Sequence, residues 1–434
     1  MCSKGCRDRP GDAVDDDGPE ADQSLRGSMN THARTMDASL VEMRPVLLLP
    51  GAVGFYFSFR LLAVLLSVRL FNQDAQAGVG AGLALNFLLL ALAAFHSMGP
   101  AQRSLASMVR VPCFRWVLVF LGFSGCSLLW SSTASLAAAV AYWCALAADV
   151  AIVVLLLRTG PIEDVSRALM KGYIWGSCAI AFTAWILPAQ SDLRLGDEEL
   201  LGPNQIGYAC AFAFFLAQYL IRRKERFWAI PAVFLAITLL RSLSKTTIIA
   251  FIAGQTLLLV RDRTVSRKSK ILMIAAAVLI TAMFWGLLES YYVVYENAGN
   301  QAETLTGRLG IWAYFLEQSL EMPWIGHGFH SVWKVIPPFG EFEARHAHNE
   351  LLQQFYAYGV VGVGMLAAIY GSFYRQIRKL SAGPFKTFFL GLLVFILVRG
   401  FADTEPFDLS LPLWAIALFG SIFEQASRSN EVAA

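Results

Sequence analysis

Four of the six histidines lie between residues 304 and 364, in the longest polar interruption of an otherwise apolar sequence. His346 and His348 stand near its end, and His348 is followed by Asn349 and an apolar run. An imidazole at such a junction can titrate near neutral pH and can accept a proton from a hydroxyl group. From residue type alone, a histidine that caps or hydrogen-bonds the start of a helix is an open alternative.

The histidines do not form a firm metal motif. His327 and His330 give an HxxH pattern and His346 and His348 an HxH pattern, but no Asp or Glu follows at a firm ligand spacing. The seven cysteines contain no CxxC pair, and none of them lies in the polar stretch. We therefore expect no metal, no other cofactor and no disulfide framework.

Arg308 is the basic residue of the polar stretch best placed to bind an anion. A helix is predicted to begin near Gly307, with Thr306 as its cap, and Trp312 shares a face with Arg308 one turn later. An anion bound there would meet both the guanidinium fork and the N-terminus of the helix. A structural ion pair is the alternative role for Arg308.

Membrane helices must position these residues. The 434-residue chain is 56% hydrophobic and 15% charged, whereas soluble domains carry about 25% charged residues. Apolar runs of roughly 17 to 25 residues recur without the alternation of barrel strands, and each is long enough to cross a bilayer as a helix. The sequence predicts an all-α polytopic integral membrane protein of about twelve transmembrane helices. The predicted spans are 46–70, 79–96, 113–131, 135–157, 171–188, 204–221, 227–242, 245–260, 271–289, 350–373, 386–402 and 409–424.

Basic residues gather in alternate loops, which predicts that these loops and both termini are cytoplasmic. The polar stretch then lies outside. We expect a disordered cytoplasmic leader at 1–44, nine spans within 45–289, a large outer insert at 290–349, three spans within 350–425 and a cytoplasmic tail at 426–434. The PWIGHGF segment of the insert carries Trp324 and Phe329, which fit membrane-interface anchors better than rings that stack on sugars.

Some charged residues stand out against this topology. Lys245 and Arg399 lie on the outer side, where few cations are expected. Arg399, with Asp403 and Glu405 just beyond it, can border a substrate cleft at the outer end of the eleventh span. Ionisable residues inside predicted spans are functional candidates by default, although Arg60 and Asp149 can simply pair with each other.

His348-Asn349, nine residues, and then Gly359-x-x-Gly362 resembles the H-[N/S/Q]-x9-G-x-x-G signature of a family of bacterial membrane glycosyltransferases, the O-antigen ligase and polysaccharide polymerase superfamily. TGRLGIW and PWIGHGF resemble the G-R-x-x-x-W and P-x-x-G-x-G segments of the same family. GPNQIGYACAFAFF is similar to a segment in which an Asn opens a span after a periplasmic loop. These matches cover roughly residues 200 to 365.

The resemblance implies a metal-independent transfer, at the periplasmic face of the inner membrane, of a glycan carried on undecaprenyl diphosphate. It makes His348 the candidate base and Arg308 a ligand of the diphosphate. Asn349, Trp312 and Arg399 are further candidates for substrate binding. The implied partners are the lipid-linked oligosaccharide and the bilayer, with room for a flippase and a chain-length regulator but no role for nucleic acid.

In the family, a second basic residue is expected to bind the diphosphate together with the residue at the position of Arg308, and here it departs from the usual pattern. Its S-x-S-R segment is here Ser242-Leu243-Ser244-Lys245. Lysine keeps the positive charge but loses the bidentate fork of arginine. The variant is similar to members of the exopolysaccharide polymerase branch, and Arg241 is an alternative source of the cation.

The resemblance therefore predicts an inverting glycosyltransferase that polymerises lipid-linked repeat units into an exopolysaccharide or O-antigen-like polysaccharide. Two alternatives to this polymerase stay open at this point. An O-antigen ligase, which transfers finished glycan to the lipid A core, shares the fold and the signature. A transporter of lipid-linked sugars would instead show inverted repeats and charged residues near the membrane midplane, for which Arg60 and Asp149 are the only candidates.

Overall fold

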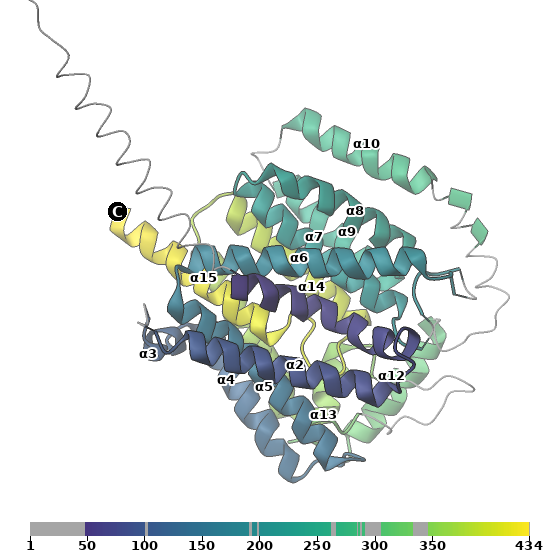
Figure 1. Cartoon of the computed structure of the whole chain (residues 1–434), viewed down its shortest axis with the longest axis vertical. Coiled ribbons are helices and arrows are strands. Elements are labelled where there is room, and N and C mark those ends of the chain that lie inside the picture. The colour runs from purple at the N-terminus through teal and green to yellow at the C-terminus, as the bar shows by residue number, and fades with distance from the viewer. Residues whose placement is uncertain are drawn as a thin grey trace, which may run out of the picture. The chain divides into compact units, whose positions relative to one another are not determined.

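The computed structural model describes residues 48–99, 103–190, 193–197, 199–261, 266–283, 285–286, 289–290, 305–332 and 346–433. The predicted leader at 1–44 lies outside these residues, as do 291–304 and 333–345 of the predicted insert. All of the described residues belong to the compact unit Leu48–Ala434 (Figure 1).

Within the described residues the secondary structure is helical, apart from an isolated bridge between Asp197 and Leu201. A first helix, Leu48–Arg69, precedes those labelled in Figure 1. The others are α2 (Ala75–His96), α3 (Leu105–Val109), α4 (Pro112–Cys126), η1 (Ser127–Leu129), α5 (Leu136–Thr159), α6 (Ile162–Ile186), α7 (Pro203–Arg222), η2 (Arg226–Trp228), α8 (Ala229–Arg241), α9 (Lys245–Arg261), α10 (Arg267–Met283), α12 (Leu305–Ser319), α13 (Glu350–Lys379), α14 (Pro384–Ala402) and α15 (Leu413–Ala433).

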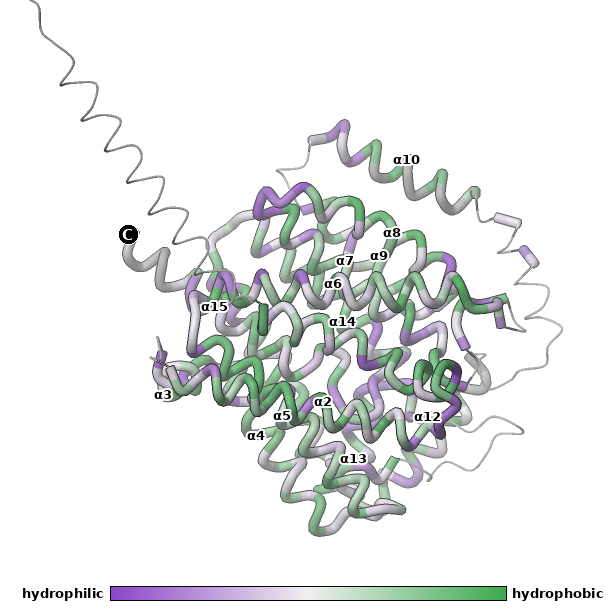
Figure 2. Tube along the Cα trace, viewed as in Figure 1, coloured by the Kyte–Doolittle hydropathy of each residue, from purple (hydrophilic) through white to green (hydrophobic). Residues whose placement is uncertain are grey.

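Six of the described helices are long and apolar enough to cross a membrane: Leu48–Arg69, α2, Pro112–Leu129, α5, α13 and α14. They coincide with six of the predicted spans, and Figure 2 shows hydrophobic residues along them. The other six predicted spans fall on α6, α7, α8, α9, α10 and α15. Of these, α8 has 13 residues and α9 and α10 have 17 each, fewer than the about 20 that a bilayer needs. A count of twelve spans therefore stays a prediction.

Close helix packing holds the segments that carry the candidate residues. Helix α13 packs against α4, α12 and α14, and α14 packs against α9. At the α9–α14 contact, a Cβ on Gly254 would lie 2.7 Å from the carbonyl oxygen of Gly391. Small residues at such crossings allow backbones to approach closely, as in other membrane proteins.

The connection between α14 and α15 is largely buried against α13. Glu350, in the first turn of α13, accepts hydrogen bonds from the backbone N–H of Ser410 (2.7 Å) and from the Tyr370 hydroxyl (2.9 Å). Backbone groups away from water need such partners. The start of α13 and the segment after α14 are therefore held together, and both carry candidate site residues.

Paired charges explain the intramembrane residues Arg60 and Asp149. Arg60 Nη1 donates to Asp149 Oδ2, so the first helix and α5 share an ion pair, as the alternative interpretation predicted. The predicted helix at the start of the insert is also observed, as α12, but it begins at Leu305, so Thr306 lies inside the helix and is not its cap. Phe329, in contrast, is not an interface anchor, because its side chain is buried against other aromatic rings, whereas Trp324 is exposed.

Candidate active site

His348 stands at the start of α13 but does not cap it. Asn349 is the cap, because its Oδ1 accepts the N–H of Leu352 at 3.1 Å. His348 has a φ of +50°, a left-handed conformation that is uncommon for a residue with a side chain. Such backbone strain is often found at functional sites. Asn349 therefore caps the helix, and the alternative prediction that His348 is the cap is wrong.

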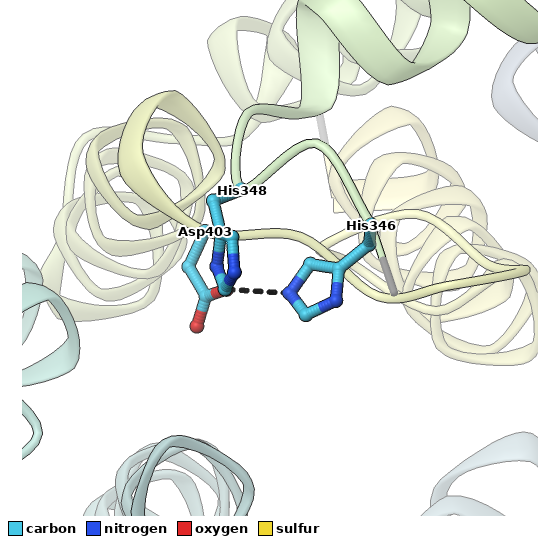
Figure 3. Close-up of side chains that lie close together, drawn as sticks. All are labelled: His346, His348 and Asp403. Carbon is cyan, nitrogen blue, oxygen red and sulfur yellow. Dashed lines mark hydrogen bonds and ion pairs between the residues drawn. The ribbon is translucent and has the colours of Figure 1, made fainter. Parts of the chain in front are cut away.

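Asp403 brings the two histidines of the HxH pattern together. Its Oδ1 lies 3.3 Å from Nδ1 of His348 and 3.3 Å from Nε2 of His346. Figure 3 shows both rings beside this carboxylate. The same oxygen accepts the N–H of Thr404 at 3.0 Å. Because an ionised carboxylate only accepts hydrogen bonds, the histidine nitrogens that face it carry the hydrogens. The Nε2 atom of His348 is then left with a lone pair that can take a proton.

Arg399 holds Asp403 in its ionised form. Nη2 of Arg399 lies 2.8 Å from Oε1 of Glu405 and 3.5 Å from Oδ2 of Asp403, and the guanidinium lies 4.0 Å above the ring of Tyr208. Burial opposes ionisation of Asp403, but the charge of Arg399 and the hydrogen bonds from both histidines hold the pKa of this carboxyl well below its ordinary value.

His348 is neutral at physiological pH. Burial lowers the pKa of its imidazole to about 4, and neighbouring His346 and the positive charge of Arg308 act in the same direction, against the opposing effect of Asp403. The ring therefore has an unprotonated nitrogen available.

Arg308 and Trp312 of α12 face the same site. Nη1 of Arg308 donates to the carbonyl of Ala402 at 2.7 Å, immediately before Asp403. Nε1 of Trp312 donates to the carbonyl of Ala347 at 3.0 Å, immediately before His348. The two residues that share a helix face in the sequence thus tie α12 to both segments that form the histidine–aspartate contact.

Asn349 has structural partners at both ends of its amide. Besides capping α13, it donates from Nδ2 to the carbonyl of Phe401 at 2.9 Å. These contacts fix the start of α13 against the end of α14. A direct contact of Asn349 with substrate stays a prediction.

Lys245 and Arg241 lie at the turn between α8 and α9. Ser244, the residue before Lys245, donates from Oγ to Oδ1 of Asn204 at 2.8 Å. Nη1 of Arg241 donates to the carbonyl of Leu193 at 2.8 Å. Helix α7 links this turn to the site, because Asn204 and Tyr208 are one helical turn apart and Tyr208 lies beneath Arg399. That Lys245, Arg308 and His348 contact the same bound substrate stays a prediction.

A kink in α13 explains the first glycine of the signature, Gly359. Gly359 has φ +62° and ψ −157° inside the helix. Across the kink, Val360 donates its N–H to the carbonyl of Pro323 at 2.8 Å, and Val361 donates to that of Trp324 at 3.3 Å. The PWIGHGF segment thus supplies acceptors for helix donors that the kink releases.

Replacing Gly359 with alanine is expected to lower the free energy of unfolding by more than about 2 kcal/mol, because of the left-handed backbone and because a Cβ would lie 2.5 Å from the Pro323 oxygen. A thermal melt in detergent measures this. Gly364→Ala is the matched control, since a Cβ there meets nothing within 4 Å. Equal melting of the two variants would contradict the proposed role of the kink.

His327 and His330 belong to a different neighbourhood. His327 stacks on Tyr356 with ring centroids 4.3 Å apart. His330 stacks between Tyr142 (5.4 Å) and Phe407 (4.9 Å). The four histidines of the insert are therefore divided into a packing pair and the pair on Asp403.

The sequence interpretation missed the contact between Asp403 and the two histidines. It named Asp403 and Glu405 only as neighbours of Arg399 beside a cleft. The available signal was topological, since the segment after the eleventh span and the end of the insert were predicted on the same side of the membrane. Tyr208, beneath Arg399, had no signal beyond its place in the GPNQIGY segment.

Residues 230–367 match the model of a protein family described as O-antigen ligase. The match begins in α8 and ends in α13, so it includes Lys245, Arg308 and His348 but not Asp403. No curated protein matches the chain. The match to the O-antigen ligase family at residues 230–367 supports assignment of the chain to the O-antigen ligase and polymerase superfamily of bacterial membrane proteins.

Proposed function

We propose that the chain joins undecaprenyl-diphosphate-linked repeat units into an exopolysaccharide or O-antigen-like polymer at the periplasmic face of the inner membrane. The observation that carries the proposal is the contact of His348 Nδ1 with Asp403, 3.3 Å long, in a cluster that also contains Arg308 and Arg399. The match of residues 230–367 to the O-antigen ligase family supports a membrane glycan-transfer function.

In the proposed reaction, His348 acts as the general base. Its Nε2 takes the proton of an acceptor hydroxyl while the hydroxyl oxygen forms a bond to the anomeric carbon of the donor. The bond between that carbon and the diphosphate breaks, and the electron pair leaves with undecaprenyl diphosphate. Attack from the face opposite the leaving group inverts the anomeric carbon. Asp403 stabilises the imidazolium that forms and keeps Nε2 directed away from itself.

The fixed cations supply the second half of the proposed chemistry. A departing diphosphate needs its charge neutralised, and guanidinium and ammonium groups in a partly dry site can do this without a metal. Arg308, half-buried beside Ala402, is the first of these cations, and Lys245 is the second. The glycan acceptor approaches from the side of His348, and the lipid carrier explains a site at the ends of membrane helices.

A deletion strain tests the polymerase assignment. We expect single repeat units to accumulate on the lipid carrier, because chain extension is lost while the supply of repeat units continues. Mass spectrometry of extracted lipid-linked intermediates measures this, and the lipid A core should remain normally capped. The description of the matched family as O-antigen ligase favours the second candidate function. Loss of core capping with intact polymer would support that candidate and contradict the polymerase.

A further inference from the structure

His346, His348 and Asp403 have the donor atoms of a transition-metal site. Nε2 of His346, Nδ1 of His348 and Oδ1 of Asp403 all lie within 4.8 Å of one another. Figure 3 shows the three side chains close together. Two imidazoles and one carboxylate form a ligand set that Zn²⁺ accepts, with a fourth position for water. The sequence pattern gave no such indication, because Asp403 is 55 residues from His348.

Two of the three separations within this cluster match the spacing of ligand atoms around a tetrahedral metal ion. Both histidine nitrogens lie 3.3 Å from Oδ1 of Asp403. Charge-assisted N–H···O bonds are usually about 2.7–2.9 Å long. In a tetrahedron with zinc–ligand bonds of about 2.0–2.1 Å, neighbouring ligand atoms are about 3.3 Å apart. Asp403 already presents one oxygen to both rings.

From this geometry we infer that His346, His348 and Asp403 form a reversible inhibitory site for Zn²⁺. Imidazole ligands select zinc and its neighbours over Mg²⁺ and Ca²⁺. Arg399 lies 3.5 Å from the other oxygen of Asp403, and the charge of Arg308 also acts on His348. Two nearby cations weaken the hold on a dication, so the ion exchanges with solution instead of residing permanently.

Binding of zinc blocks the proposed base. When Nδ1 of His348 coordinates the ion as a neutral imidazole, the hydrogen moves to Nε2, and no proton is released. Nε2 can then no longer take a proton from the acceptor hydroxyl. The inhibition, though not the binding itself, rests on the proposed function of His348.

Cobalt binding tests the site without reference to catalysis. The purified full chain in detergent is titrated with Co²⁺, whose visible absorption bands report tetrahedral coordination, and Zn²⁺ is then added to displace it. We expect the wild type and the control His96→Ala to bind one ion, and His346→Ala to lose the bands. His346→Gln serves as a second variant, with thermal melts to establish folding. Absence of the bands in the wild type, or their persistence in folded His346 variants, would overturn the inference.

Transfer assays test the inhibition. Saturating Zn²⁺ should lower the rate of the wild type by about 100-fold or more, as expected when a general base is blocked. EDTA should restore the rate, and Mg²⁺ should have no effect. His346→Ala should resist zinc, and equal inhibition of this variant would reject the site as the cause. An active His348→Ala variant would refute the proposed function, whereas the cobalt titration would still decide the metal site.

Discussion

Replacement of His348 with alanine is expected to lower glycan transfer by about 1,000-fold, within the range of about 10²–10⁴ that a positioned general base contributes. The variant loses the lone pair on Nε2 of His348, which the contact of Nδ1 with Asp403 directs away from the carboxylate. A purified-enzyme assay with a lipid-diphosphate oligosaccharide measures the rate. Binding of the donor should change little, because the diphosphate is proposed to contact Arg308 and Lys245.

The chain offers a closely matched control for this experiment. His346 lies two residues away and contacts the same oxygen of Asp403, and its more exposed ring supports that carboxylate without acting as the base. In metal-free buffer, His346→Ala should lower the rate far less than His348→Ala, because it removes one hydrogen bond to Asp403 and leaves the base in place. A His348→Ala variant with the same rate as His346→Ala would remove the basis of the proposed mechanism. Such a result, with glycan still moved across the membrane, would favour a transporter.

Asp403→Asn is expected to produce the second large effect, a fall in kcat of about 10³–10⁴-fold, as in other sites where a carboxylate fixes the tautomer of a base. The amide can present an N–H to Nδ1 of His348, which then carries its hydrogen on Nε2. The ring keeps its position but loses its basic nitrogen. The substitution also removes one of the two carboxylates that surround Arg399.

A comparison of kcat and KM separates this role from a structural one. The KM for the lipid-linked donor should stay close to that of the wild type, because the proposed diphosphate ligands remain. Asp197→Asn is the matched control, since Asp197 pairs with the exposed Arg69 and has no assigned part in the transfer. A fall in thermal stability that accounts for the whole loss of activity would contradict the proposed orientation of His348 by Asp403.

Local signals in the sequence predicted much of the fold. Hydropathy located six of the described helices that can cross a membrane, and Thr306 and Gly307 lie within two residues of the observed start of α12. These features depend on neighbouring residues and on apolar length, which a single sequence displays directly. The same reasoning placed Arg308 and Trp312 on one helix face, and both reach the segments around His348.

The parts that sequence reasoning missed depend on contacts between distant segments. The pairing of His348 with Asp403 arises because α13 and α14 pack together and Asn349 bonds the carbonyl of Phe401. No local pattern encodes that register. Phe329 illustrates the same limit, because an aromatic residue suits either a membrane interface or a core, and only the packing around Phe407 assigned it to the core.

The helical segment between His348 and Gly359 has a length that is fixed at both ends. One of its ends is marked by the cap at Asn349, and the other by the kink that receives Pro323 and Trp324. One added residue would turn the base by about 100° around the helix axis and move it by about 1.5 Å. The nine residues between the two parts of the signature therefore set the position of His348 relative to the kink. With this spacing, His348 contacts Asp403 while the other end of the helical segment stays bound to the outer insert.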